Sequence, residues 1–203
     1  QGDDIAIGEW GRRVPISGIE VTQGRVYTYR RSGETWTETA SLVPRESAKW
    51  FGRSLAMSGD RLIVGAEQEY ADGLMSGGAY VFKRRLDNST WEREAILQPV
   101  PLRAHQSFGA VVRIDGDLAM VSATNDSPDA AGAVYVFGRQ GTAWVQRRRL
   151  VPHDPNEEEL FGRTIDLRGN RAGIGASSGG GPKAGAYVFT RAGNDGWIEH
   201  VKL

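Results

Sequence analysis

Hydrophobic and polar residues follow one another in short stretches that match strands. Residues 51–58, FGRSLAMS, alternate with a period of two, and residues 61–66, RLIVGA, form a mostly apolar run that suits burial on both faces. Residues 77–84, GGAYVFKR, and 91–99, WEREAILQP, predict two further strands, the second ended by its proline. No sustained helical period of about 3.6 residues occurs. The pattern therefore predicts a unit of four short strands.

This unit recurs along the chain, because its markers return in a fixed order. A Phe-Gly pair opens the first strand, and Gly-Asp or Gly-Asn follows it in a tight hairpin turn that needs positive φ. A Tyr-x-aromatic triplet marks the third strand, and a tryptophan and a Leu-x-Pro triplet mark the fourth. The markers are Phe51, Phe108 and Phe161; Gly59, Gly116 and Gly169; Tyr27, Tyr80, Tyr135 and Tyr187; Trp36, Trp91, Trp144 and Trp197; and Leu42, Leu97 and Leu150.

Repeats that cannot bury both faces alone must pack against one another. Four strands per repeat predict an all-β fold, a β-propeller of four-stranded antiparallel blades. The recurring phenylalanine and tryptophan are expected to lie between blades as wedges. We assign one region, 1–203, and divide it into repeats 1–47, 48–104, 105–156 and 157–203. The first repeat begins at its hairpin turn and lacks its first strand.

The composition narrows the classes of function. The chain has 203 residues, with 25 Lys and Arg against 25 Asp and Glu, and its zero net charge gives no support to nucleic-acid or acidic-membrane binding. It has no cysteine, which excludes disulfides and a thiol nucleophile. No segment approaches the roughly 20 apolar residues of a membrane span. Because the chain starts at Gln1 with no signal-like stretch, we expect a processed or excised piece of a longer product.

The order Phe-Gly, Ser-Gly-Asp, Val-Gly-Ala and Ala-Tyr-Val-Phe resembles the FG-GAP repeat, the unit of integrin-α-type β-propellers. It is similar in particular to the bacterial branch of that family, which occurs in large exported proteins. The resemblance covers essentially the whole chain and implies an integrin-like propeller. The kelch repeat is the alternative, because Gly77 and Gly78 precede Tyr80, but the other copies lack this double glycine.

The resemblance also raises the question of calcium, because many members carry an Asp-x-Asp-x-Asp-Gly loop between their first two strands. Here the short turns MSGDR, IDGDL and LRGNR hold that place. They offer too few carboxylates for the roughly six to eight oxygens that calcium takes. Asp115 and Asp117 could at most hold calcium weakly, so we expect no cofactor and no metal site.

Propellers of this family usually have more blades than this chain has repeats, so three arrangements stay open. The chain is a fragment of a longer propeller, which we favour, or a small four-bladed ring with an imperfect seam. In the third arrangement a strand from another chain fills the place of the missing strand and gives a dimer or polymer. The expected partners are therefore a protein or glycan ligand, further repeats, or another copy.

The loops between second and third strands, and between successive repeats, are expected to share one rim. Function in repeat scaffolds usually resides in such loops, and these vary in length and residue type, unlike the strands. Arginine and aromatic residues are enriched where proteins bind partners. Ordinary rim positions without a ligand are the alternative interpretation. The candidate ligand-binding residues are Trp10, Arg12, Arg13, Trp50, Glu67, Glu69, Tyr70, His105 and His153, all predicted to be exposed.

These features predict a non-catalytic recognition and adhesion scaffold, secreted or on the cell surface, that presents its rim loops to a protein or glycan. The chain has three histidines without metal-ligand spacing and no Gly-x-Ser-x-Gly motif. A self-assembling structural subunit, formed by strand complementation, is the first alternative. The second is a propeller enzyme such as a polysaccharide lyase or hydrolase. That reading needs acidic or histidine residues converging on the channel, which Arg53, Arg113, Arg163 and Asp166 of the inner strands barely suggest.

Overall fold

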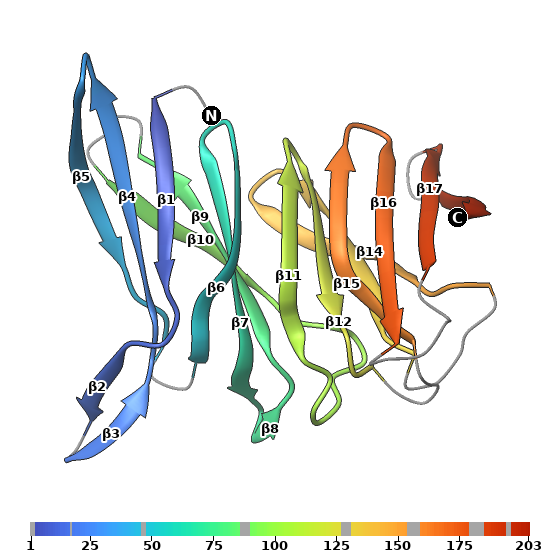
Figure 1. The fold of residues 1–203 in the computed structure, drawn as a ribbon, viewed down its shortest axis with the longest axis horizontal. Helices are drawn as coiled ribbons and strands as arrows, with labels where there is room; N and C mark the ends of the chain where they lie inside the picture. Colours follow the sequence, from blue (N-terminus) through green and yellow to red (C-terminus); the bar gives the residue numbers. More distant parts are fainter. Residues whose placement is uncertain are drawn as a thin grey trace.

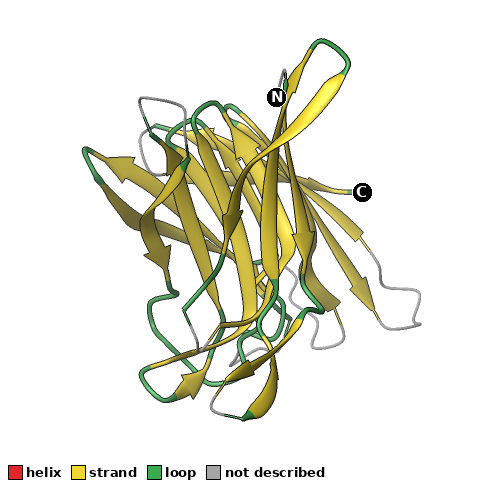
Figure 2. Ribbon diagram, turned by 90° about the vertical axis from the view of Figure 1, so that its left-hand side faces the viewer, coloured by secondary structure: helices red, strands yellow, loops and turns green. Residues whose placement is uncertain are grey.

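The computed structural model shows an all-β fold, as the sequence predicts (Figures 1 and 2). The structure describes residues 3–16, 18–45, 48–85, 90–126, 131–153, 159–178, 185–193 and 196–203. Four antiparallel sheets stand side by side in a row, with the first and last sheets at opposite ends (Figure 1). In the described part of the chain, no helix is long and apolar enough to span a bilayer.

The first sheet has three strands, in the order β1-β4-β5. They are β1 (Asp4–Glu9), β4 (Arg25–Ser32) and β5 (Thr35–Leu42). The connection from β1 to β4, predicted as a loop, instead contains a small hairpin of β2 (Arg13–Ile16) and β3 (Ile19–Thr22), which projects at the lower left of Figure 1. Alternation in RVPI and IEVT was the signal for it, and two short paired strands satisfy backbone groups that a loop would leave to water.

The other three sheets each contain the complete four-strand unit, in sequence order from the innermost strand outward. The second sheet also gains a short strand, β8, which pairs with the extended end of β7. The strands are β6 (Ala48–Ser58), β7 (Arg61–Ala71), β8 (Leu74–Met75), β9 (Gly78–Arg84) and β10 (Trp91–Leu97); β11 (Phe108–Asp115), β12 (Leu118–Ala123), β13 (Ala133–Gln140) and β14 (Ala143–Leu150); β15 (Glu159–Arg168), β16 (Arg171–Ser178), β17 (Gly185–Ala192) and β18 (Gly196–Lys202).

The Phe-Gly pair has a structural cause that its recurrence alone does not reveal. The strand register shifts directly after Phe51, Phe108 and Phe161, where each first strand carries a bulge. The glycine that follows each phenylalanine has a φ of 89°, 92° or 91°, a conformation that only glycine adopts readily. The bulge turns the phenylalanine toward the neighbouring sheet. The predicted hairpin glycines also have positive φ, of 58°, 57° and 56° at Gly59, Gly116 and Gly169.

The second strand of one sheet approaches the first strand of the next so closely that glycine is required between them. A Cβ placed on Gly65 would overlap the carbonyl oxygen of Gly109 in the next sheet. The same relation holds one sheet earlier, where a Cβ on Gly8 would overlap the carbonyl oxygen of Gly52. Adjacent sheets therefore touch through their backbones near the inner strands, and side chains fill the space between the outer strands. This difference in spacing makes each pair of sheets diverge outward.

Three apolar clusters fill the spaces between successive sheets, and each contains one Phe-Gly phenylalanine. Phe51, Phe108 and Phe161 are completely buried. Each meets the tyrosine of its own sheet edge to face, with ring centroids 5.3 Å apart for Phe51 and Tyr80 and 5.6 Å apart for Phe108 and Tyr135. The predicted role of phenylalanine as the wedge between sheets is confirmed.

The tryptophan wedge is confirmed in part. Trp91 is 7% exposed and belongs to the cluster between the first two sheets, and Trp144 and Trp197 pack partly against the next two clusters. Trp36 is 43% exposed, so the prediction is wrong there. The physical reason is position, because each wedge tryptophan packs toward the preceding sheet, and no described sheet precedes the first.

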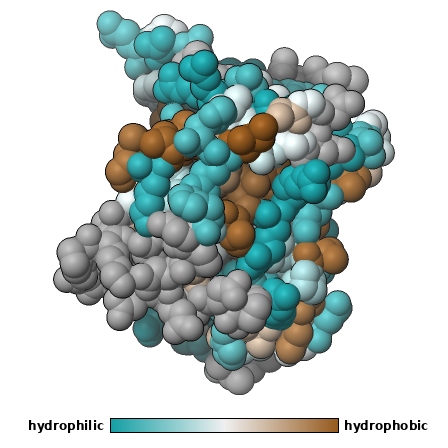
Figure 3. All heavy atoms as spheres, turned by 90° about the vertical axis from the view of Figure 1, so that its right-hand side faces the viewer, coloured by the Kyte–Doolittle hydropathy of each residue, from teal (hydrophilic) through white to brown (hydrophobic). Residues whose placement is uncertain are grey.

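Both ends of the row expose an apolar face. On the first sheet Ile5 and Ile7 are exposed beside Tyr29 and Tyr27, their cross-strand partners in β4. The matching residues of the second sheet, such as Leu62 and Val64, are fully buried against the first sheet. At the other end Ile198, Val201 and Leu203 are exposed, and Figure 3 shows apolar atoms open on this side.

Candidate functional site

Three of the predicted rim residues lie close together. Trp10 follows β1, Trp50 lies in β6, and Glu67 lies in β7. The two indoles pack edge to face with ring centroids 6.2 Å apart and an angle of 73° between their planes. Arg53 completes the group, because its guanidinium lies 5.1 Å over the ring of Trp50 and 2.6 Å from Glu67 Oε2. We call Trp10, Trp50, Arg53 and Glu67 the inner-rim cluster.

Glu67 and Trp50 of this cluster are replaced by other residues at the equivalent repeat positions of the later sheets, whereas Arg53 recurs in the fourth sheet as Arg163. The position of Glu67, directly after an alanine that ends the repeated apolar run, holds Thr124 in the third sheet and Ser177 in the fourth. The position of Trp50, directly before the repeated phenylalanine, holds Ser107 and then Leu160. Because packing requires the repeated residues, exposed residues that vary at repeated positions are free to serve a ligand.

The backbone of Trp50 supports a specific role for its side chain. Its φ is 59°, in the left-handed region that costs a bulky residue about 1–3 kcal/mol. The equivalent Ser107 has a φ of 55°, so the conformation does not depend on the indole. A tryptophan therefore occupies a place that glycine or asparagine would fill with less strain.

A cleft continues from the cluster across the inner strands. It has a volume of about 700 Å³ and takes side chains from the second, third and fourth sheets. Its cationic lining consists of Arg53, Arg113 and Arg163, and Glu67 is its one carboxylate. The remaining polar lining includes the hydroxyl residues Ser54, Thr124, Thr164 and Ser177. With three cations against one anion, the cleft is electropositive within a chain of zero net charge.

Glu69 does not belong to the exposed site, and its predicted exposure is wrong. Its side chain is fully buried, and its Oε1 accepts hydrogen bonds from the guanidinium of Arg45, 3.2 Å from Nε. A Cβ on Gly78 would overlap the other carboxylate oxygen, which places that oxygen against the backbone of β9. Residues two apart face the same side of a strand, so the sequence pattern alone could not separate the buried Glu69 from Glu67, which is 13% exposed and lines the cleft.

The other predicted residues lie apart from the inner-rim cluster. Arg12 donates to Glu9 and to Tyr27, at 3.3 Å in both cases, and Arg13 begins β2. Tyr70 is exposed, with the ammonium of Lys49 5.8 Å from its ring centroid. His105 and His153 are exposed on connections that precede the third and fourth sheets, and His153 contacts Glu199.

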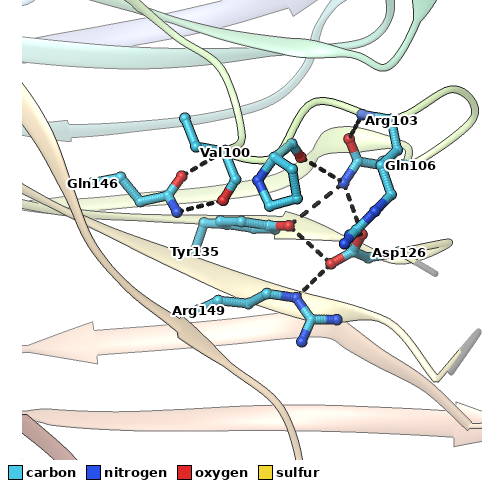
Figure 4. Close-up of polar contacts among 8 residues, drawn as sticks. Val100, Arg103, Gln106, Asp126, Tyr135, Gln146 and Arg149 are labelled. Atoms are coloured by element: carbon cyan, nitrogen blue, oxygen red, sulfur yellow. Dashed lines mark hydrogen bonds and ion pairs between the residues drawn. The ribbon is translucent and has the colours of Figure 1, made fainter. Parts of the chain in front are cut away.

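A buried network around Asp126 holds the rim connection of the third sheet, and sequence reasoning missed it (Figure 4). The Asp126 side chain is fully buried. Its Oδ1 accepts from Gln106 Nε2 at 2.7 Å and from Arg103 at 3.2 Å, and its Oδ2 accepts from the Tyr135 hydroxyl at 2.8 Å and from Arg149 Nε at 2.7 Å. With four donors on two oxygens, this carboxylate ties the connection that holds Arg103 and Gln106 to strands β13 and β14. It is therefore not open to a ligand.

The same combination of tyrosine, carboxylate and arginine occurs in three sheets. Tyr27 donates to Glu9 in the first sheet, Tyr80 lies beside Glu69 and Arg45 in the second, and Tyr135 donates to Asp126 in the third. The signal was present in the sequence, because Glu69 and Asp126 both stand three residues after the alanine that ends the apolar run. These groups fix the rim on which the inner-rim cluster lies.

The buried tyrosines predict that the protein loses stability in alkali. Burial first, and the nearby carboxylates next, raise the pKa of Tyr80 and of Tyr135 to about 12, from 10.0. Their contribution is complete below pH 10. As the pH rises from about 10 to about 12, the unfolded chain releases protons that the folded chain retains, so the free energy of unfolding falls. Urea midpoints measured across this range should decrease.

The matched control is the Tyr135→Phe variant, which removes one of the two raised pKa values. Its urea midpoint should be lower at neutral pH, because Asp126 loses a hydrogen bond, but should decrease less steeply in alkali. Equal slopes in the wild-type protein and the variant would contradict the assignment of the alkaline effect to Tyr135.

The residues present do not fit the calcium site that many FG-GAP repeats carry. Among the described residues, no group of three or more His, Asp or Glu side chains could hold a metal ion. Asp117 pairs with Arg139 at 2.6 Å, and Asp115 accepts a hydrogen bond from the backbone of Gly169 at 2.6 Å. Both carboxylates near the second hairpin turn therefore serve protein contacts.

Successive four-stranded sheets that pack face to face, with their inner strands in contact, define the β-propeller class of repeat proteins. A family model described as the FG-GAP repeat matches residues 36–82 and 91–137. Each matched segment runs from the outer strand of one sheet to the third strand of the next. These two segments are therefore FG-GAP repeats, as the sequence resemblance indicated. No curated protein matches the chain.

Proposed function

We propose that this chain is a non-catalytic recognition and adhesion module of a secreted or cell-surface protein. It binds a protein or glycan ligand through the inner-rim cluster. FG-GAP repeats are typical of extracellular proteins, and the family match supports this location. The observation that carries the proposal is the pair of indoles, Trp10 and Trp50, packed together at repeated backbone positions where the other sheets hold different residues.

The chemistry of the cluster suits binding. Trp10 is 48% exposed, although a tryptophan that served only the core would be buried. Tryptophan and arginine are the residues most often responsible for affinity at binding surfaces. Arg53 is held by both Trp50 and Glu67, so its guanidinium is oriented before a ligand arrives. Such preorganisation reduces the entropy lost on binding.

The arrangement of acid–base groups supports a non-catalytic role. The histidines at positions 105, 153 and 200 come from three different segments, and His153 is paired with Glu199. Asp126 and Glu69, the buried carboxylates of the rim, serve arginine and tyrosine partners. A general acid or base must instead reach a reacting group.

The Trp10→Ala variant tests the proposed site. The intact chain is first screened on an array of immobilised glycans and purified extracellular-matrix proteins. Because Trp10 is half exposed, its removal should leave the melting temperature nearly unchanged. We expect the affinity for the selected ligand to fall about thirtyfold, which is the effect of removing a tryptophan hot spot. Binding is measured by titration calorimetry.

The matched control is Trp36→Ala, because Trp36 is similarly exposed but lies on β5, at the outer edge of the first sheet. It should keep full affinity. Ligands that bind Trp10→Ala as tightly as the wild-type protein would place the binding surface elsewhere and refute the proposal for this cluster.

The exposed face of the first sheet favours a second candidate function, a self-assembling subunit. Strand β1 is an edge strand, whereas its equivalents β7, β12 and β16 are paired on both sides. Ile5 and Ile7 are exposed where the equivalent Leu62 and Val64 are buried. A second copy that supplied a strand or a sheet here would reproduce a contact that the chain already makes three times.

Sedimentation equilibrium tests this second candidate. Assembly predicts a mass that rises with protein concentration and returns to the monomer in Ile7→Lys, because a charge on the covered face would have to be buried. The control is Val145→Lys, which changes an exposed residue of β14. A wild-type protein that stays monomeric at high concentration would eliminate self-assembly.

A further inference from the structure

We propose that the ligand is an acidic glycan, a sugar chain with carboxylate or sulfate groups, and that Arg113 and Arg163 bind those groups in the inner cleft. The inference rests on the proposed recognition function and specifies the ligand of the same site. The indoles of the inner-rim cluster form one end of the binding surface, and the cleft that shares Arg53 and Glu67 with the cluster forms the other.

The first argument is charge pairing. Many arginines elsewhere in the chain meet carboxylates, as Arg61 meets Glu94 at 3.0 Å and Arg149 meets Asp126 at 2.7 Å. In the cleft, Arg113 donates to the carbonyl oxygen of Val112, and neither it nor Arg163 forms an ion pair with a described carboxylate. Two guanidinium groups without a described anion, on the wall of one cleft, favour an anionic ligand.

The second argument is convergence. Arg53 comes from β6, Arg113 from β11 and Arg163 from β15, and β11 lies between the other two inner strands. These cations are far apart in sequence, so neighbouring positions in one strand do not explain their placement in one cleft. Cations on three adjacent strands suit a chain that carries repeated negative charges.

The third argument separates a glycan from an acidic protein or a nucleic acid. The cleft has about 700 Å³, the size of a pocket for a small ligand or a few linked sugars, whereas protein partners cover wide surfaces. Hydroxyl side chains of Thr164 and Ser177 can both donate to and accept from sugar hydroxyls. A chain of zero net charge also lacks the basic surplus that nucleic-acid binding requires.

A second groove, between the third and fourth sheets, provides a comparison inside the molecule. It has a volume of about 630 Å³ and is lined by Arg139, Arg147 and Arg191. There Arg139 pairs with Asp117, and Asp115 contributes a further carboxylate. Because its cations are accompanied by anions, this groove gives weaker support for an anionic ligand than the inner cleft does.

The test measures binding of the intact chain to three probes by titration calorimetry. The probes are a uronic-acid oligosaccharide, a sulfated oligosaccharide and a neutral oligosaccharide of the same length. We expect at least one acidic probe to bind, with affinity that falls as salt is added, and the neutral probe to bind at least tenfold more weakly. The first two probes distinguish carboxylate from sulfate as the recognised group.

Arg163→Gln should lower the affinity for the acidic probe about tenfold or more, which is the effect of losing a charge-assisted hydrogen bond. The double variant Arg113→Gln, Arg163→Gln should weaken it further. The matched control is Arg168→Gln, which removes the same charge from the same strand at a side chain that is 88% exposed and outside the cleft lining. It should bind like the wild-type protein, and all variants should keep the wild-type melting temperature.

Three outcomes would overturn the inference. They are equal binding of the neutral probe, unchanged binding in the double variant, and equally tight binding of a polyglutamate peptide or single-stranded DNA. The Trp10→Ala variant separates this inference from the proposed function. A ligand that needs Trp10 but not the arginines leaves the recognition site standing and refutes the acidic glycan. An acidic probe that needs the arginines but not Trp10 supports the acidic glycan and refutes the recognition site at Trp10.

Discussion

Replacing Phe108 with alanine is expected to lower the free energy of unfolding by about 3–5 kcal/mol. Phe108 is completely buried between the second and third sheets, and its ring meets both Tyr135 and Phe137 edge to face. Because the neighbouring sheets are also held by backbone contact near Gly65 and Gly109, they cannot close the cavity that the substitution leaves. Chemical denaturation followed by tryptophan fluorescence measures the loss.

The same variant should also reduce the cooperativity of unfolding. In a repeat protein each unit is stabilised mainly by its neighbours, so a weakened interface lets the two halves of the chain unfold separately. Tyr70→Ala is the control, because it removes an exposed aromatic side chain of the second sheet. A Phe108→Ala protein as stable as this control would show that the wedge is not what holds the sheets together.

Gly65→Ala is expected to be the next most damaging change, with a loss of about 3 kcal/mol. The added methyl group would overlap the carbonyl oxygen of Gly109, which is backbone and cannot move without displacing the third sheet. Its φ is not in the left-handed region, so the effect comes from crowding alone. Thermal and urea unfolding of the variant would both detect it.

The fourth sheet supplies the matched control for this prediction. Gly173 lies in β16, the equivalent second strand, and a Cβ there would meet no other atom within 4 Å. Gly173→Ala should leave stability unchanged or raise it by about 0.5–1 kcal/mol, because glycine loses more backbone entropy in a strand than alanine does. Similar losses in both variants would mean that strand propensity, rather than close approach of the sheets, governs these positions.

The repeat divides the chain into positions that hold the sheets together and positions that are open to selection for a ligand. Phe51, Phe108 and Phe161 are identical because the same space is filled three times. Trp50 and its equivalents Ser107 and Leu160 differ, although each stands directly before the repeated phenylalanine. On this view a family member could change its ligand by changing the inner rim while the wedges stay constant.

The sequence by itself determined the architecture. Strands, hairpin turns and repeat length follow from the period-two alternation, the glycines with positive φ and the recurrence of markers, all of which are local properties. The order of strands in each sheet then follows, because successive strands joined by short turns pair with one another. Trp10, Trp50 and Glu67 were predicted in the same way, as residues of the variable rim connections, although Trp50 and Glu67 lie within β6 and β7.

Tertiary structure alone decided which of those residues are accessible and which meet. Glu67 and Glu69 look alike in sequence, yet one faces the cleft with Arg53 and the other is buried with Arg45. Trp36 carries the same marker as Trp91 and is exposed, because burial depends on a neighbouring sheet rather than on the residue. Arg113 and Arg163 share a cleft because their strands come together around the inner edge. Local pattern fixes which face a side chain takes, but only the packing of sheets fixes what lies opposite that face.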